Sequence, residues 1–529
     1  MVTAVRAITV APGVFAPGHL GELTQVIPFE LVDAVLAESG RTERRLRLVP
    51  SRVALYLVLA MALFEHVAVT GVWSKPTAPF HAPGSARPSE KALRDARRRI
   101  GAEPLKALFE VLAGPLAQPA TPGVRYRRYR TVAFDGCSST KIPDTPRNRA
   151  LYGPAPVRHG HSGYPMLALM TLVETGSRAL IGAVFGPTGT GEIEYAEKLL
   201  DRLDATMVPL NDRGFDSQTF LAKIAATGAQ LLVRATANRR PAVLAHLPDG
   251  SYLTLIGGLR LRVIEAEITV TGADGSRRTA TYRLLTTLLD HRLDPAATLL
   301  ALYHERWEIE TAYLALRHTL LDGRVLRSKD PTALAQEMWA ILTVYQALRT
   351  VMCEAAESRP GTDPDRMCFT LALDNARTQT ILANLGENTD RPGAIGRAVL
   401  AEPNPARRPR YSARKLKSPG NRYTYKDPTR PTTSTPITDI AIHIQPPTTP
   451  TAPTAPPGDP EKPPEKHHIL ALLQQPPDQP RRLPEIAAAL GISGRLHTNR
   501  LGTRLRRWAH QGLLTKTAPG TYTTKKPPT

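Results

Sequence analysis

The chain opens with a long stretch in which apolar and polar residues alternate with the period of an α-helix, from about residue 18 to residue 116. Residues 49–67 are apolar on nearly every side of such a helix, which predicts a buried core helix. Residues 89–112 are amphipathic and carry four arginines on or near one face: Arg94, Arg97, Arg98 and Arg99. A basic helix of this kind often lies on DNA, but a solvated charged face explains it equally well.

After residue 129 the pattern changes to short apolar runs typical of strands. Three strands are predicted first, and a helix, a strand, a helix and a strand follow them. Their ranges are 130–135, 164–176, 178–186, 192–203, 206–212, 217–228 and 229–236. Ribonuclease H-like domains use this order, which predicts a mixed α/β sheet with helices packed on its faces.

Residues 238–290 alternate apolar and polar positions with a Gly-Ala-Asp-Gly turn, which predicts an antiparallel β insertion. Helices follow, notably over residues 333–356. After residue 401 the chain is basic with interspersed tyrosines and then rich in Pro and Thr, so residues 401–465 are predicted to be a linker, and its Pro- and Thr-rich tract is predicted to be extended and disordered.

Residues 466–529 regain an ordered pattern, with a short helix, a strongly basic second helix and a predicted β wing. Their order resembles a winged helix, and a basic helical hairpin is the alternative. The sequence therefore divides into an α-helical, DNA-binding region at 15–118, a core at 125–400, the linker, and this winged-helix-like region.

Composition adds a preference for a polyanionic partner. Lys and Arg number 68 against 47 Asp and Glu, a formal net charge of +21, which favours nucleic acid over an anionic membrane; a generally basic proteome is the alternative reading. The three cysteines lie far apart, which disfavours a disulfide framework or a zinc site and fits a reducing compartment. No apolar run is long enough to span a bilayer, so we expect a cytoplasmic protein.

The most informative segment is a helix predicted over residues 302–320. At 3.6 residues per turn, four of its side chains lie within about 60° of one another: Tyr303, Arg306, Glu310 and Arg317. One face of this helix thus carries a carboxylate between two guanidinium groups and beside a phenol, which suits a metal ion and a phosphate backbone.

Two further acids end predicted strands, Asp135 in the first and Asp212 in the fourth. In a ribonuclease H-like topology these strand ends meet at one edge of the sheet. Three carboxylates in one place would repel unless cations lay between them, and two Mg²⁺ ions roughly 4 Å apart would relieve that repulsion. Each acid alone is more readily explained as a turn residue or a surface ion pair, and it is their joint occurrence that predicts a site.

These motifs resemble the DDE transposases of bacterial insertion sequences, in the group named after insertion sequence four. Phe-Asp-Gly at 134–136, Asn-Asp-Arg-Gly-Phe at 211–215 and a Tyr-x2-Arg-x3-Glu-x6-Lys signature carry the resemblance, with Arg317 in the lysine position. Residues from about 15 to 425 are covered, including a region like the one that precedes the catalytic core in that group.

The resemblance implies DNA cleavage and strand transfer at terminal inverted repeats, with two Mg²⁺ or Mn²⁺ ions. By carry-over, Asp135, Asp212 and Glu310 are the catalytic residues and hold the metal ions, while Tyr303, Arg306 and Arg317 contact DNA phosphates. It further implies double-stranded DNA partners at the element ends and the target, a homodimer on DNA, no membrane, and association with the nucleoid. The alternatives are a catalytically inactive, transposon-derived DNA-binding protein and a ribonuclease H-like nuclease without strand transfer.

Three smaller motifs remain. Residues 186–195 are glycine-rich but lack Gly-Lys-Ser/Thr, so a turn that caps a helix is favoured over a phosphate loop. His159 and His161 are favoured as loop residues over a metal site. Residues 126–130 (Tyr-Arg-Arg-Tyr-Arg) are consistent both with a path for the DNA backbone and with an exposed edge strand.

Overall fold

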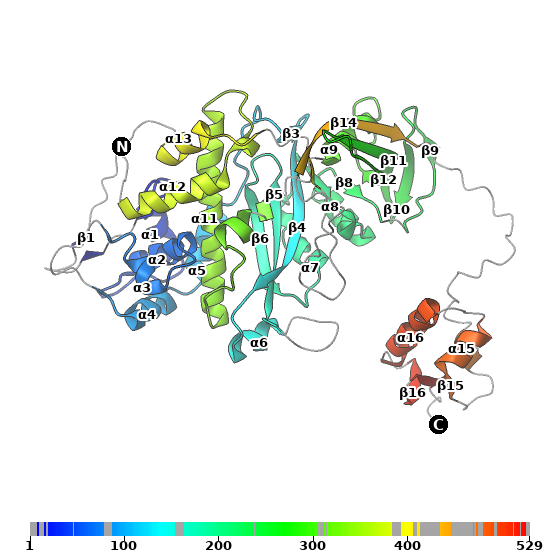
Figure 1. Cartoon of the computed structure of the whole chain (residues 1–529), viewed down its shortest axis with the longest axis horizontal. Coiled ribbons are helices and arrows are strands. Elements are labelled where there is room, and N and C mark those ends of the chain that lie inside the picture. Colours follow the sequence, from blue (N-terminus) through cyan, green and yellow to red (C-terminus); the bar gives the residue numbers. More distant parts are fainter. Residues whose placement is uncertain are drawn as a thin grey trace. The chain divides into compact units, whose positions relative to one another are not determined.

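The computed structural model divides the chain into two compact units, Met1–Pro447 and Thr448–Thr529 (Figure 1). In the first unit the structure describes residues 19–45, 47–78, 87–153, 163–236, 238–304, 315–382, 393–405 and 434–445, with 8–9, 15–16, 306, 312–313 and 410–412. In the second it describes residues 469, 472–473, 480–490, 495–510, 513–518 and 520–524. Each unit is described by itself.

The first unit begins with a group of helices. They are α1 (Phe29–Glu38), α2 (Ser51–Leu63), α3 (Val69–Trp73), α4 (Glu90–Ile100) and α5 (Glu103–Leu112), preceded by a two-residue strand pair, β1 (Ile8–Thr9) and β2 (Phe15–Ala16). Every residue of α2 except Arg52 is buried, which confirms the core helix predicted from its all-round apolar pattern.

The arginines of α4 divide between the interior and the surface. Arg97 points inward, where its guanidinium donates to Ser328 Oγ at 3.2 Å, and burial lowers its pKa. Arg99 bonds to Glu43 at 3.1 Å. Arg94 and Arg98 are exposed. The shared basic face predicted from helical spacing is therefore only half available to a partner, because two of its four arginines stabilise the fold.

A mixed sheet forms the centre of the first unit. Strands β4 (Tyr129–Lys141), β5 (Met166–Glu174) and β6 (Leu180–Pro187) are antiparallel neighbours, and β7 (Met207–Asn211) and β8 (Leu232–Arg234) run parallel to β4, in the order β8-β7-β4-β5-β6. Helices α7 (Glu192–Glu197) and α8 (Gln218–Ala226) connect β6 to β7 and β7 to β8. The predicted element order is confirmed.

The predicted insertion is antiparallel, as expected, but it extends the same sheet. It contains β9 (Ala245–His246), β10 (Tyr252–Ile256), β11 (Leu259–Gly272) and β12 (Arg277–Thr286). β12 pairs antiparallel with β8 over three residues of β8: Leu232, Val233 and Arg234. This pairing joins the insertion to the central sheet.

The predicted linker at 401–465 differs from the structure over residues 434–444. This segment is the strand β14 (Ser434–Ile444), which pairs with β11, and a short strand β13 (Arg410–Ser412) pairs with β14. Ile440, Ile442 and Ile444 pack against the core, and the positions that alternate with them, Asp439, Ala441 and His443, are exposed. A half-buried strand has this period of two. The pattern was overlooked because the neighbouring residues are rich in Pro and Thr.

The remaining helices are α6 (Pro146–Tyr152), α9 (Ala296–His304), α11 (Pro331–Glu357), α12 (Phe369–Leu382) and α13 (Ala394–Ala401), together with a π-helix, η5 (Ala315–Leu320). The long helix α11 stands beside β6 (Figure 1), where Trp339 and Phe185 place their ring centroids 4.7 Å apart and Gln346 accepts a hydrogen bond from Leu180 N at 2.8 Å. One hydrophobic core joins α11, the N-terminal helices and this face of the sheet. Within the described residues, no helix is long and apolar enough to cross a membrane.

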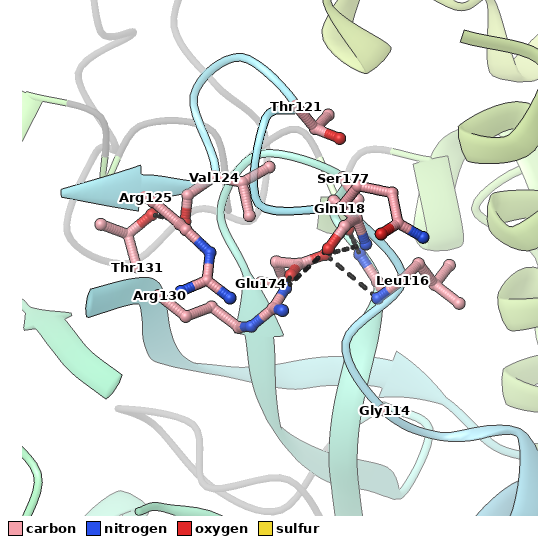
Figure 2. Close-up of polar contacts among 12 residues, drawn as sticks. Gly114, Leu116, Gln118, Thr121, Val124, Arg125, Arg130, Thr131, Glu174 and Ser177 are labelled. Carbon is pink, nitrogen blue, oxygen red and sulfur yellow. Dashed lines mark hydrogen bonds and ion pairs between the residues drawn. The ribbon is translucent and has the colours of Figure 1, made fainter. Parts of the chain in front are cut away.

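A fully buried carboxylate fastens the sheet to the chain that leaves α5 (Figure 2). Glu174, at the end of β5, forms an ion pair with Arg130 of β4 and accepts a hydrogen bond from Ser177 Oγ. Its Oε2 also accepts from the backbone N–H groups of Leu116 and Ala117, at 3.3 and 3.2 Å. One side chain thus links β4, β5 and the segment that follows α5.

The second unit contains the two helices and the hairpin predicted for residues 466–529. They are α15 (Leu483–Ala489), α16 (Arg495–His510), β16 (Leu514–Ala518) and β17 (Thr521–Thr524), with a short strand β15 (Arg481–Arg482) that pairs with β17. Ile486, Leu505, Trp508, Leu514 and Tyr522 form its core.

Candidate active site

The register of β4 and β7, extended by three residues past their last paired position, brings Asp135 of β4 level with Asp212, which directly follows β7. β4 and β7 are parallel, and their paired residues include Arg130 with Met207 and Val132 with Pro209, an offset of 77 (207 − 130 = 77). The same offset relates the two acids (212 − 135 = 77). Neighbouring strands lie about 4.8 Å apart, and side chains at matching positions of a parallel pair share a face. The two carboxylates that end separate predicted strands therefore belong to one edge of the sheet.

Local backbone contacts fix each carboxylate. Asp135 Oδ1 accepts from Gly136 N at 2.9 Å, and Asp212 Oδ1 accepts from Gly214 N at 2.7 Å, where it caps the 3₁₀ turn η3 (Arg213–Phe215). A Cβ on Gly214 would lie 2.9 Å from Asp212 Oδ1, so a larger residue here would displace the Asp212 carboxylate from this position. Both aspartates are half-buried.

The helix predicted to carry the polar stripe reaches the same place. Tyr303 is 4% exposed and its hydroxyl donates to the carbonyl oxygen of Asn211 at 3.1 Å. Burial raises the pKa of Tyr303 to about 12, the nearby charge of Arg306 acts to lower it, and that of Asp212 acts to raise it. Arg306 is half-buried, with its guanidinium carbon 5.9 Å from the centroid of the Tyr303 ring. Tyr303 and Arg306 are thus grouped with Asp212.

The two other residues of the predicted stripe are Glu310 and Arg317. Glu310 lies outside the described residues. Arg317 is half-buried on the π-helix η5, a rare conformation that is frequently found at functional sites. The uniform 3.6-residue period predicted over residues 302–320 therefore does not hold within η5, which has a wider winding.

The structure also shows two residues that the sequence patterns did not single out. Tyr313 donates its hydroxyl to the carbonyl oxygen of Asp135 at 2.7 Å. Glu192, the first residue of α7, lies between the two aspartate turns, with Oε1 3.3 Å from the position of a Cβ on Gly136 and Oε2 3.9 Å from that of a Cβ on Gly214. The sequence assigned this region to a turn that caps a helix. The structure confirms that assignment. The position of Glu192 near Gly136 and Gly214 depends on packing between distant segments, which the local sequence does not encode.

The donor set can be compared with the metal ion that it would hold. Carboxylate oxygens are the ligands that Mg²⁺ and Mn²⁺ prefer in proteins. Asp135 and Asp212 supply such oxygens from one sheet edge. In the part of the chain that the structure describes, no group of three His, Cys, Asp or Glu residues could hold a metal ion. The residues present therefore fit two ligands of a magnesium site, and Glu310, the third ligand predicted from the sequence, lies outside the described residues.

The segment 126–130 has a structural role. Arg127 and Arg128 form the turn between β3 (Arg125–Tyr126) and β4, with Arg127 at a φ of 53°. Tyr126 and Arg127 both bond to Asp294, at 2.8 and 3.1 Å. Since Arg130 is paired with Glu174, most of this segment serves the fold. His159 and His161 lie outside the described residues.

Two family models match the chain. The model described as "Insertion element 4 transposase N-terminal" covers residues 17–110, and the model described as "Transposase DDE domain" covers residues 134–347. The second range contains both aspartates and the helix with Tyr303.

Two curated proteins of Escherichia coli (strain K12) are similar to the chain. One, named "Transposase InsG for insertion sequence element IS4", is 28% identical over 310 residues, 54% of this chain. The other, named "Putative transposase InsZ", is 25% identical over 206 residues, 38% of this chain. In both cases the chain covers 66% of the relative, just under two thirds.

Among solved structures, a piggyBac transposase synaptic complex with hairpin DNA is similar to this chain. The match covers 73% of this chain and 86% of the piggyBac chain. The sequence identity is 10% and the TM-score is 0.34, which is too low to establish a common fold.

Proposed function

The chain belongs to the DDE transposases related to insertion sequence 4, and from this premise we propose that it cleaves and rejoins DNA at the ends of an insertion sequence. The observation that supports the proposal is the common offset of Asp135, near the middle of β4, and Asp212, directly after β7, along two adjacent parallel strands. Two acids at one sheet edge, inside the region that matches the DDE domain, are what metal-dependent phosphodiester chemistry requires.

In this proposal Asp135, Asp212 and Glu310 hold two Mg²⁺ or Mn²⁺ ions. Bound there, such ions would activate a water or 3′-hydroxyl nucleophile and stabilise the leaving oxygen. The protein contributes position: Gly136 N and Gly214 N orient one oxygen of each aspartate. Preorganised groups of this kind supply much of the rate in phosphoryl chemistry.

Arg306 and Arg317 are proposed to contact phosphates near the cleaved end. Arg317 stands where the family signature has lysine, and its planar guanidinium binds phosphate through two parallel hydrogen bonds where an ammonium acts as a point charge. Tyr303 was expected to join them, but its hydroxyl is already donated to Asn211, which favours another role for it.

The experiment for this function is a cleavage assay with DNA that carries the element ends and Mg²⁺. We expect cleavage at the ends and joining of the 3′ ends to target DNA. Cleavage without joining would indicate a nuclease without strand transfer. Binding without cleavage in any divalent metal would indicate a transposon-derived DNA-binding protein and would contradict the proposal.

We also propose that the second unit is a winged-helix domain that binds DNA. On α16, Arg506 is exposed and Arg504 is half-exposed, with its guanidinium carbon 5.1 Å from the centroid of the Trp508 ring. The α-helical region at 15–118, with Arg94 and Arg98 exposed on α4, is proposed as another DNA contact. A homodimer that brings two ends together, in the nucleoid, follows from the family as a further proposal.

Removal of residues 463–529 is expected to weaken binding to the element ends and to reduce its salt dependence. Each phosphate contact that is lost makes the negative slope of log K against log salt shallower by about 0.9. The measurement is a set of binding titrations between about 50 and 200 mM salt for the full chain and the truncated chain. Residues 1–447 form a compact unit of their own, and a melting curve controls for their folding. Equal affinities and slopes would refute the role of the second unit.

A further inference from the structure

Two buried phenols reach the strand ends that carry the aspartates, one on each strand. Tyr303 donates to the carbonyl oxygen of Asn211, the residue before Asp212, at 3.1 Å. Tyr313 donates to the carbonyl oxygen of Asp135 itself at 2.7 Å. Both tyrosines come from the segment after the β insertion, so one stretch of chain holds β4 and β7 at the level of the two acids.

Further hydrogen bonds complete this arrangement. Phe134 N donates to the side-chain oxygen of Asn211 at 3.3 Å and links β4 to β7 directly. The Tyr313 hydroxyl also lies 3.1 Å from Thr171 Oγ1, and Thr171 is the residue of β5 paired with Asp135. The backbone at Asp135 is therefore bonded on three sides, by β5, by Tyr313 and, through Phe134, by Asn211.

Both hydroxyls remain protonated donors. Tyr303 is 4% and Tyr313 is 7% exposed. Burial raises the pKa of each phenol, that of Tyr313 well above its ordinary value. A group in this state has one proton to give, and in both tyrosines a backbone carbonyl receives it.

We propose that Tyr303 and Tyr313 are positioning residues that hold the Asp135 and Asp212 backbones at the separation a pair of metal ions requires. The inference rests on the proposed function, and it reassigns Tyr303 from a phosphate contact to a support of the strand end. Outer groups that orient metal ligands typically change metal affinity or activity by about 10- to 100-fold when removed. The two tyrosines also stand on either side of Glu310 in the sequence, so both flanks of the third proposed ligand are tied to the strands.

The test compares three variants that each lose one buried hydroxyl: Tyr313→Phe, Tyr303→Phe and a control, Tyr56→Phe. Tyr56 is 2% exposed and donates to the carbonyl oxygen of Ile27 at 2.6 Å, in the N-terminal helices. All three changes leave one buried carbonyl without that donor, so all three should lower the melting temperature. Only the first two remove a bond to the aspartate strands.

Two readouts separate positioning from stability. We expect Tyr313→Phe to reduce the cleavage rate by about 10- to 100-fold and to weaken Mn²⁺ binding to the DNA-free protein, measured by electron paramagnetic resonance, by a similar factor. Tyr56→Phe should leave both unchanged per folded molecule. For Tyr303→Phe we expect weaker Mn²⁺ binding with unchanged affinity for the element ends. Loss of end affinity with normal Mn²⁺ binding would restore the phosphate role and overturn the inference for Tyr303.

Asp135→Asn distinguishes failure of this inference from failure of the proposed function. If Asp135→Asn loses cleavage while Tyr313→Phe behaves like Tyr56→Phe, the function stands and the positioning role is wrong. If Asp135→Asn cleaves like the unmodified chain, the proposed function is wrong. Mn²⁺ binding still decides the positioning role in that case, because unchanged binding in Tyr313→Phe contradicts it.

Discussion

Asp135→Asn and Asp212→Asn should each reduce the rate of end cleavage by roughly 10³-fold, the size seen when a preorganised electrostatic group is removed from a catalytic site. Asn keeps the shape of the side chain and the hydrogen bond from Gly136 N at position 135 or from Gly214 N at position 212, but it removes the charge that would bind a cation. The measurement is single-turnover cleavage of labelled end DNA at saturating protein.

Folding should survive these substitutions. Two carboxylates at one sheet edge repel each other in the absence of cations, so removal of one charge should leave the melting temperature of the metal-free protein unchanged or slightly higher. Asp201→Asn is the matched control, because Asp201 is exposed and pairs only at 3.8 Å with its neighbour Arg202. A cleavage rate in Asp135→Asn equal to that of the control would exclude Asp135 from catalysis.

Glu174→Gln should lower the free energy of unfolding of the first unit by about 3–5 kcal/mol, the typical cost of breaking a buried ion pair from one side. The Glu174 side chain is fully buried and that of Arg130 is 13% exposed. The variant would leave the Arg130 guanidinium buried with only neutral partners, and it would weaken the attachment of residues 116–117 to the sheet (Figure 2). The change is measured by urea denaturation, monitored with a spectroscopic signal that reports on the first unit.

Glu110→Gln provides the control for this effect. Glu110 pairs with Lys106 at 3.6 Å on α5, with both side chains about half exposed, and such pairs contribute about 0.3–0.5 kcal/mol. If Glu174→Gln costs no more than Glu110→Gln, the buried network does not stabilise the unit as inferred. At temperatures where Glu174→Gln is folded, its cleavage rate per folded molecule should be normal, because Glu174 makes no contact with the aspartates.

The sheet could be predicted as far as local patterns determine it. Each strand from β4 to β8 has its own apolar run, and the order of strands and helices was enough to place Asp135 and Asp212 at one edge. The pairing of β12 with β8 and of β14 with β11 joins segments that are far apart in the chain. No local period encodes such pairing, so the sequence predicted the insertion without its partner strand and placed the β14 segment in the linker.

The acidic residues of the candidate site could be predicted from the sequence, but the side chains that hold their strands in place could not. Acids at strand ends have a local signature, and the family motifs strengthen it. The partners of Tyr303 and Tyr313 lie 92 and 178 residues away, and contacts over such separations are set by the fold. The position of Arg97 was also beyond local prediction. Helical spacing placed it on a basic face, but its guanidinium points inward and donates to Ser328, which is 231 residues away.

The central claim is that Asp135, Asp212 and Glu310 form one metal-dependent site for DNA cleavage. The most direct measurement is Mg²⁺-dependent cleavage of the element ends by the unmodified chain, by Glu310→Gln and by Glu308→Gln, a control that changes an acid two positions away on the same segment. We expect cleavage by the unmodified chain and by Glu308→Gln, and loss of cleavage in Glu310→Gln. Undiminished cleavage by Glu310→Gln would exclude Glu310 from the catalytic site.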